Sequence, residues 1–379
     1  MSFYKKHKTI INISILFLLS RLPMIIFLLL HKFGIVLNNT SGVLFIDKSS
    51  SLFLYLYDGA HYLNIAGSGY SVNNLFAFFP LYPFLIRLLH MMHISLSTAG
   101  IIISNVSFFL SLLVLNAMLK KSKNRNIILA LYAFSPILSF TTMCYTESIY
   151  LLLTILTFYY YKKKEYLISS FFLGLSMLTR NTGYILMGAI LIDMLYKYFK
   201  KDNIKFINIF KYSLIAISIG MIYPIYLFIK TGDFLYFSTI QFDYWQRANG
   251  YVVLTIINDI KFLIHNLNVS YIYIFSLNWI FFLIAIIIGI KIYKKDKVSS
   301  IYLIVSALLC AFTYRIHMDS DSVLPSISLF RYVFTLFPLY LYLPSIKIKN
   351  INIRVLLYVL YFIIVLINTI GIYCGGFIA

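Results

Sequence analysis

The sequence predicts an all-α, polytopic membrane protein, and three observations indicate this class. Hydrophobic residues make up 61% of the 379-residue chain and charged residues only 12%, with a mean hydropathy of +0.87. Apolar runs recur from end to end, and each is long enough to cross a bilayer as a helix. Amides inside lipid must bond within their own segment, and the runs lack the alternation of membrane β-strands.

The first predicted span covers about residues 9–30. Lys5, Lys6 and Lys8 precede it, as in a signal peptide, but the run is too long for a signal core and no cleavage site follows. We therefore expect a retained helix with its N-terminus in the cytoplasm. Arg21 falls inside this run, where a charge is costly, and it either snorkels or pairs within the bundle.

Residues 31–96 form the first long external loop. Helical spacing over 52–65 predicts a short interfacial helix. The apolar stretch 76–92 contains two prolines and an arginine. As a full span it would place the basic segment 120–125 outside, against the positive-inside rule, so we predict a re-entrant or interfacial helix.

The later apolar runs complete a single integral-membrane domain, 1–379, of about eleven spans. A second long external loop, 231–271, is less hydrophobic and should hold one or two short helices. Eight of the twelve acidic residues fall in external intervals under this topology. The expected spans are 9–30, 97–119, 126–143, 146–161, 166–179, 182–197, 212–230, 273–293, 298–313, 330–346 and 355–374.

The net charge of +20 does not indicate nucleic-acid binding. The lysines and arginines lie in short clusters between apolar runs, which is typical of cytoplasmic loops facing anionic lipid, and no nucleic-acid motif accompanies them. Cys144, Cys310 and Cys374 are odd in number and lack the spacing of a metal site or disulfide framework. We interpret them as buried spectators.

Two carboxylates are candidates for chemistry. Asp58 is flanked by Tyr57, His61 and Tyr62. A carboxylate there can act as general base on a hydroxyl, and the tyrosine rings can stack on a sugar, although an Asp-Gly step is also typical of a turn. Glu147 begins a helix on the same predicted side. It either complements the helix N-terminus or faces Asp58 as a second carboxylate for substrate hydroxyls or a metal ion.

Arginines could bind an anionic phosphate. Arg180 lies at an external helix junction, and Arg331 has a similar place; either could instead anchor the chain at the interface. Arg315 and His317 are weaker candidates, and Arg87 could contact a lipid phosphate or snorkel. No glycine-rich nucleotide motif is present, so a lipid-linked activated sugar suits an external site better than a nucleotide sugar.

The ordered motifs resemble the PIG-V family, the mannosyltransferases that add the second mannose to glycosylphosphatidylinositol, and their prokaryotic relatives. The most specific blocks are 57–70 and 77–83, where Tyr57 replaces the family's usual Trp. Residues 145–148 match the second acidic motif. Arg180 and Arg331 stand in segments similar to later signatures, which other GT-C glycosyltransferases share loosely.

This resemblance implies a GT-C fold, a polyprenyl-phosphate sugar donor with mannose as the expected sugar, and inverting transfer. Asp58 would take the proton of an acceptor hydroxyl, or would only hold the acceptor. Arg180 and Arg331 would stabilise the departing phosphate. The expected partners are the bilayer, the donor, and a lipid or glycan acceptor at the cell membrane. A divalent metal at Asp58 and Glu147, and a partner subunit, stay open.

Two other functions are weighed against this one. A flippase or transporter of lipid-linked glycans would need charged groups in the middle of several helices, and inverted repeats. Here charges cluster at helix ends, with Arg21 the chief exception, and no repeat is visible. A glycan polymerase or ligase would differ in transferring a whole oligosaccharide.

Overall fold

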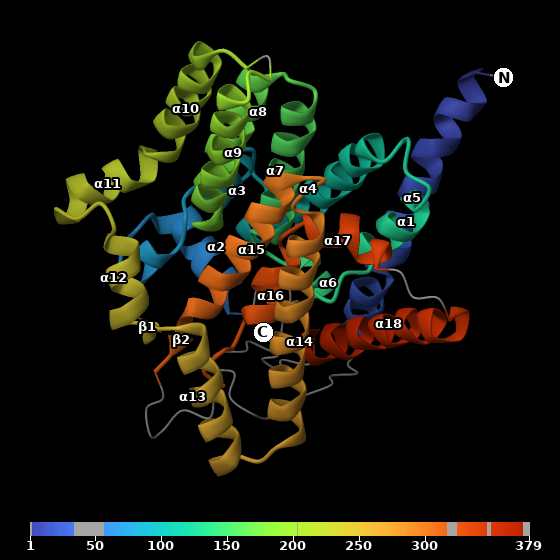
Figure 1. The fold of residues 1–379 in the computed structure, drawn as a ribbon. Coiled ribbons are helices and arrows are strands. Elements are labelled where there is room, and N and C mark those ends of the chain that lie inside the picture. Colours follow the sequence, from blue (N-terminus) through green and yellow to red (C-terminus); the bar gives the residue numbers. More distant parts are fainter. Residues whose placement is uncertain (1, 34–56, 203, 317–323, 347–349, 374–379) are drawn as a thin grey trace. The chain divides into compact units, whose positions relative to one another are not determined.

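The computed structural model describes residues 2–33, 57–202, 204–316, 324–346 and 350–373 (Figure 1). These residues are almost entirely helical, and the chain divides into two compact units. The first unit comprises residues 1–69, 81–159 and 343–377, and the second comprises residues 70–80, 160–342 and 378–379.

The first unit is all helical over its described residues. Its helix α4 begins where the Ser95 hydroxyl accepts the backbone N–H of Thr98 at 3.2 Å, a typical N-cap. The elements are α1 (Ser2–Lys32), α2 (Asp58–Ser68), α3 (Leu81–His90), α4 (Leu96–Met118), α5 (Arg125–Ala133), α6 (Leu138–Thr142), most of α7 (Glu147–Lys162), the 3₁₀ helix η3 (Leu343–Ser345) and α18 (Ile351–Tyr373).

The second unit contains most of the remaining helices and a small antiparallel ribbon. The ribbon pairs Arg247 with Arg315 and Asn249 with Thr313. Its elements are the 3₁₀ helix η2 (Asn73–Ala77), α8 (Tyr166–Met177), α9 (Thr182–Phe199), α10 (Phe206–Gly220), α11 (Ile222–Thr231), α12 (Tyr236–Asp243), β1 (Arg247–Asn249), α13 (Val252–His265), α14 (Val269–Ile292), α15 (Lys297–Phe312), β2 (Thr313–Arg315), α16 (Leu329–Phe334) and α17 (Pro338–Tyr342).

Among the described residues, four helices are long and apolar enough to cross a membrane: α1 over Thr9–Leu30, α4, α14 and α18. A fifth candidate is the pair α10 and α11, bent by 42°. Pro224 explains the bend, since it cannot donate to the carbonyl of Gly220, which instead accepts the Tyr184 hydroxyl at 2.7 Å. The all-α membrane class is confirmed; the count of eleven spans stays a prediction, because the other expected spans fall on shorter or less apolar helices.

Besides 212–230, which is divided between α10 and α11, two more of the expected spans are not continuous helices. The interval 126–143 is divided between α5 and α6, and Pro136 lies in the break. The interval 330–346 is divided between α16 and α17, and Pro338 begins the second helix. Proline lacks an amide proton and disfavours helix in the residue before it, so mean hydropathy alone overestimated the length of these helices.

Short helices occur in both of the long loops that are predicted to be external. The stretch 76–92 is not a full span, since its main helix, α3, has only 10 residues. The expected helix over 52–65 appears as α2, although residues 52–56 lie outside the described part. The loop 231–271 contains α12 and α13 as expected, together with β1, which at three residues is too short for an alternating pattern to reveal.

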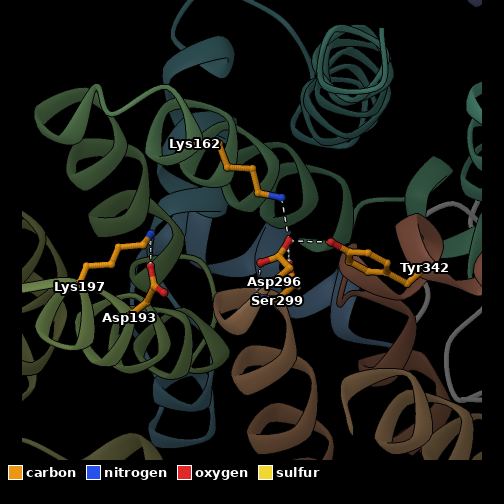
Figure 2. Close-up of polar contacts among 6 residues, drawn as sticks. All are labelled: Lys162, Asp193, Lys197, Asp296, Ser299 and Tyr342. Carbon is orange, nitrogen blue, oxygen red and sulfur yellow. Dashed lines mark hydrogen bonds and ion pairs between the residues drawn. The ribbon is translucent and has the colours of Figure 1, made fainter. Parts of the chain in front are cut away.

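Asp296 connects two of the predicted cytoplasmic loops in the second unit (Figure 2). Its Oδ2 accepts the Lys162 ammonium at 2.8 Å, the Tyr342 hydroxyl at 2.7 Å and the Ser299 hydroxyl at 2.9 Å. The turn between α14 and α15 therefore lies against the end of α7. This contact supports the prediction that the two loops share one side of the membrane.

Candidate active site

Asp58 is the first residue of α2, in the first unit. The Asp-Gly step therefore begins a helix and does not form a reverse turn, and an acidic residue in a first helical turn is stabilised by the helix dipole. The preceding Tyr57 has a φ of 53°, a region that costs a non-glycine residue on the order of 1–3 kcal/mol. Such strain is concentrated at functional sites, which favours the chemical interpretation of this motif.

Tyr62 connects the first motif to the second acidic motif. Its phenol oxygen lies 3.5 Å from the Thr146 hydroxyl, and its ring packs edge-on against Tyr82, with centroids 5.3 Å apart. Tyr82 in turn hydrogen bonds to the Ser104 hydroxyl at 2.8 Å, and Ser104 donates to the carbonyl of Tyr145 at 3.2 Å. Helices α2, α3 and α4 thus meet the segment that begins α7.

A close approach at Gly100 makes this meeting possible. A Cβ there would lie 2.8 Å from the Cys144 sulfur, so only glycine lets α4 pack so close to the turn before α7. The Tyr82 hydroxyl donates to the Gly100 carbonyl at 2.9 Å. Cys144 is buried, and burial raises the pKa of its thiol to about 12, which fits an unreactive, structural cysteine.

Glu147 is fully buried at the first position of α7. Burial raises the pKa of the Tyr82 phenol well above its usual value, and the nearby Cys144, Tyr62 and Glu147 add to the effect. Burial also lowers the pKa of His61, which Asp58 opposes. Tyr62, Tyr82, Thr146 and Glu147 therefore lie together in the first unit, and we name them the acidic cluster; His61 lies near Asp58.

Two other candidates do not join this cluster. Arg87 is exposed in the last turn of α3, and the described residues give its side chain no contact with the cluster. His317 lies outside the described residues. The sequence did not suggest site roles for three residues in or next to the cluster, Tyr82, Ser104 and Thr146. Their contacts join segments distant in sequence and leave no local pattern.

Three arginines surround the ring of Tyr332 in the second unit. Their guanidinium carbons lie 5.2 Å (Arg180), 5.7 Å (Arg247) and 6.0 Å (Arg331) from the ring centroid, within cation–π range. Arg331 is buried, with 4% exposed, and the other two are half-buried. Like charges repel, so their convergence favours an anionic ligand. We name these four residues the arginine cluster.

Sequence reasoning missed Arg247. It faces Arg315, one of the weaker candidates, directly across the β1–β2 ribbon. Opposed residues of an antiparallel pair share a face of the ribbon, and like charges there are destabilising. The only sequence signal was the position of Arg247 in a polar external loop; its pairing depends on contacts with a segment more than sixty residues away.

A buried hydrogen-bond network fixes the segment before Arg331. The Asp259 carboxylate accepts the indole N–H of Trp279 at 2.8 Å and the backbone N–H of Ser326 at 2.9 Å. The Asn278 side chain accepts the backbone N–H of Phe330 at 2.9 Å. Helix α16 therefore begins from a fixed position, which orients the buried guanidinium of the arginine cluster.

A metal at Asp58 and Glu147 is not supported by the donor set. Among the described residues, no three side chains of the ligating types are grouped so that they could hold an ion.

The fold is that of a helical membrane protein, one unit of which carries the acidic and aromatic residues and the other the arginine cluster. Residues 36–280 match the family described as Mannosyltransferase (PIG-V), so the chain belongs to that family. The resemblance noted in the motifs is thus confirmed, as is the prediction of a membrane glycosyltransferase.

Solved structures provide a more distant comparison. The crystal structure of ArnT from Cupriavidus metallidurans bound to undecaprenyl phosphate is 12% identical, with a TM-score of 0.47 over 94% of this chain and 76% of that one. The apo structure of the same protein is 13% identical, with a TM-score of 0.45 over 94% and 75%. A comparison with curated proteins found no match.

Proposed function

We propose that this protein transfers a single sugar, expected to be mannose, from a polyprenyl-phosphate donor to a hydroxyl of a lipid or glycan acceptor. The reaction inverts the anomeric carbon and takes place on the external face of the cell membrane, in a GT-C bundle of about eleven spans. The observation that carries the proposal is the arginine cluster, Arg180, Arg247 and Arg331 around Tyr332. Family membership supports it independently.

The arginine cluster has the chemistry of a phosphate site. A guanidinium offers a planar fork of donors that matches phosphate oxygens, and it keeps its charge at any physiological pH. As the bond between the anomeric carbon and the phosphate oxygen breaks, the phosphate takes the electron pair and gains charge. Fixed guanidinium groups stabilise that charge without reorganising, which lowers the barrier to transfer.

Asp58 is the proposed general base. The acceptor hydroxyl oxygen forms the new bond to the anomeric carbon, and its proton passes to the Asp58 carboxylate. Glu147, at the N-terminal end of α7, is proposed as the second carboxylate, which assists with substrate hydroxyls. Tyr57, His61 and Tyr62 supply the aromatic surface next to the base, suited to stacking on a sugar ring.

The contacts within each unit support an external location for this chemistry. Tyr62 and Thr146 join two intervals predicted to be external, 31–96 and the turn before α7. Arg180 and Arg247 lie in two further intervals that are predicted to be external, and their guanidinium groups approach the same ring. Asp296 and Lys162 join two predicted cytoplasmic loops.

The test is Asp58→Asn, assayed in detergent with polyprenyl-phosphate mannose. We expect kcat to fall by about 100-fold or more, as for loss of a general base. Asp243→Asn, which alters an exposed carboxylate in a predicted external loop, is the matched control and should keep full activity. Full activity in Asp58→Asn would remove Asp58 from the role of base.

Two readouts separate this proposal from its alternatives. Transfer by purified protein without a membrane gradient would distinguish the enzyme from a flippase. A product mass increased by one hexose would distinguish it from a polymerase or ligase. Equal turnover of nucleotide-linked mannose would overturn the proposed lipid donor.

A further inference from the structure

A cavity of about 370 Å³ lies between α1, α4 and α5, all in the first unit. Part of its lining is polar and part is apolar. The lining residues are Thr9, Asn12, Ile13, Leu16, Asn116, Arg125, Asn126 and Leu129.

The polar part of the cavity is cationic. Arg125 donates its Nε to the Asn116 side-chain oxygen at 2.6 Å, and Asn116 is itself buried, with 6% exposed. This bond uses one of the five guanidinium donors and fixes the plane of the group. The lining contains no carboxylate, and the described residues give Arg125 no ion pair. The remaining donors suit an anion with several oxygens.

The cavity lies at the ends of two candidate membrane spans, where polar headgroups would meet the hydrocarbon core. Thr9 is the first residue of the candidate span in α1, and Asn116 is in the last turn of the candidate span α4. Ile13 and Leu129, both buried, continue the lining on its apolar side. A ligand with a charged head and an apolar body would match both parts of this lining.

The predicted topology places this end of α4 in the cytoplasmic leaflet, where anionic lipids are concentrated. Three lysines follow α4 directly, Lys120, Lys121 and Lys123. The cavity is also distinct from the acidic cluster, because Ser104 and Asn116 are about 18 Å apart along α4 at 1.5 Å per residue.

We propose that this cavity binds the phosphate headgroup of an anionic phospholipid from the cytoplasmic leaflet. The Arg125 guanidinium pairs with the phosphate, and the side chains of Asn12, Asn126 and Thr9 hydrogen bond to headgroup oxygens. The first methylenes of an acyl chain contact the apolar part of the lining. The proposal does not depend on the sugar-transfer reaction.

The test measures binding of dioleoyl phosphatidylglycerol to detergent-purified full-length protein by native mass spectrometry, with phosphatidylcholine as the neutral lipid. Arg125→Gln is compared with Lys123→Gln, an exposed lysine outside the cavity. Each variant removes one positive charge, so non-specific attraction would weaken binding equally in both. If the cavity is a specific phospholipid site, the affinity for phosphatidylglycerol should fall about tenfold or more in Arg125→Gln and much less in Lys123→Gln. Equal losses would overturn the proposal.

Two further arms complete the experiment. Glycerol 3-phosphate and inorganic phosphate test the phosphate headgroup without the acyl chains. If either compound stabilises the protein against thermal unfolding at the concentration at which the lipid does so, the ligand is a free phosphate compound. If Arg125→Gln fails to fold, Asn126→Leu alters an exposed lining residue instead. We expect it to weaken phosphatidylglycerol binding about threefold, the effect of one lost hydrogen bond. Wild-type binding by this variant would contradict the site.

Discussion

The guanidinium carbon of Arg180 lies 5.2 Å from the ring centroid of Tyr332. Arg247 approaches the same ring at 5.7 Å. The face of an aromatic ring attracts cations through its quadrupole, so one side chain can hold two like charges near each other without neutralising them. A carboxylate in the same place would compete with the phosphate. Tyr332 therefore gives the arginines a common point of contact within the second unit.

The ring of Tyr332, and not its hydroxyl, should determine donor affinity. Tyr332→Leu removes the ring, so we expect KM for polyprenyl-phosphate mannose to rise by about five- to tenfold, corresponding to about 1 kcal/mol of cation–π attraction. Tyr332→Phe keeps the ring and should change KM by less than about twofold. Steady-state kinetics check both, and equal effects of the two variants would show that the hydroxyl matters instead.

Arg247 should contribute to donor binding as strongly as the arginines predicted from sequence. Arg247→Ala removes a charge-assisted hydrogen bond, so we expect KM for the donor to rise about tenfold or more. Arg247→Lys should recover only part of this, because an ammonium lacks the planar fork. Lys261→Ala, an exposed cation on α13, is the control. An unchanged KM in Arg247→Ala would exclude it from the phosphate site.

The contrast between Asp58 and Arg247 shows what sequence could predict. Asp58 stands in a local motif, so its neighbours along the chain are enough to make it a candidate for the site. Arg247 acquires its role from Arg315 and Tyr332, which join it only through the ribbon and α16. Contacts between segments far apart in sequence leave no periodic signal.

The same distinction applies to the helices. Runs such as 97–119 and 355–374 correspond closely to α4 and α18, because length and hydropathy determine a lipid-facing helix. The interval 126–143 is interrupted near Pro136, which lacks an amide donor and disfavours helix in the residue before it. Hydropathy predicts where the chain is apolar, and backbone chemistry determines where the helix stops.

Asp259 should make stability depend on pH in an unusual direction. Burial raises the pKa of its carboxyl from 3.8 to about 6, although hydrogen bonds from Ser326 and Trp279 oppose the shift. A raised folded-state pKa means that the folded protein holds a proton that the unfolded chain has lost, so stability falls as pH rises from about 4 to about 6. At about 1.4 kcal/mol per pH unit, the fall is about 3 kcal/mol.

The measurement compares Tm of the wild-type protein and Asp259→Asn between pH 4 and pH 7.5 in detergent. Other groups titrate in this range, so the informative quantity is the difference between the two proteins. As pH rises from 4 to 6, the Tm of the wild-type protein should fall relative to that of Asp259→Asn. Above pH 6 the difference between the two Tm values should stay constant. A difference that is the same at every pH would show that Asp259 keeps its charge in the folded state.

Asp296 should show the opposite pH dependence. Burial alone would raise the pKa of its carboxyl, but the charge of Lys162 and hydrogen bonds from Lys162, Tyr342 and Ser299 outweigh burial and lower it below 3.8. A lowered folded-state pKa contributes stability above the unfolded value, and this stability is lost as pH falls through the folded pKa. Between pH 5 and pH 8 the contribution should therefore be constant.

Removing this carboxylate should be costly because Asp296 is both an ion-pair partner and the N-cap of α15. Asp296→Ala loses both roles, and we expect it to lower the free energy of unfolding by about 3 kcal/mol, from the charged hydrogen bonds and a cap of about 1 kcal/mol. Asp296→Asn keeps the cap and should lose about 2 kcal/mol. Glu165→Gln breaks the exposed pair with Lys163, at 3.8 Å, and should cost less than about 0.5 kcal/mol. Thermal unfolding at pH 7 ranks the three variants. If Asp296→Asn is as stable as Glu165→Gln, the contact between the two loops contributes geometry but no stability.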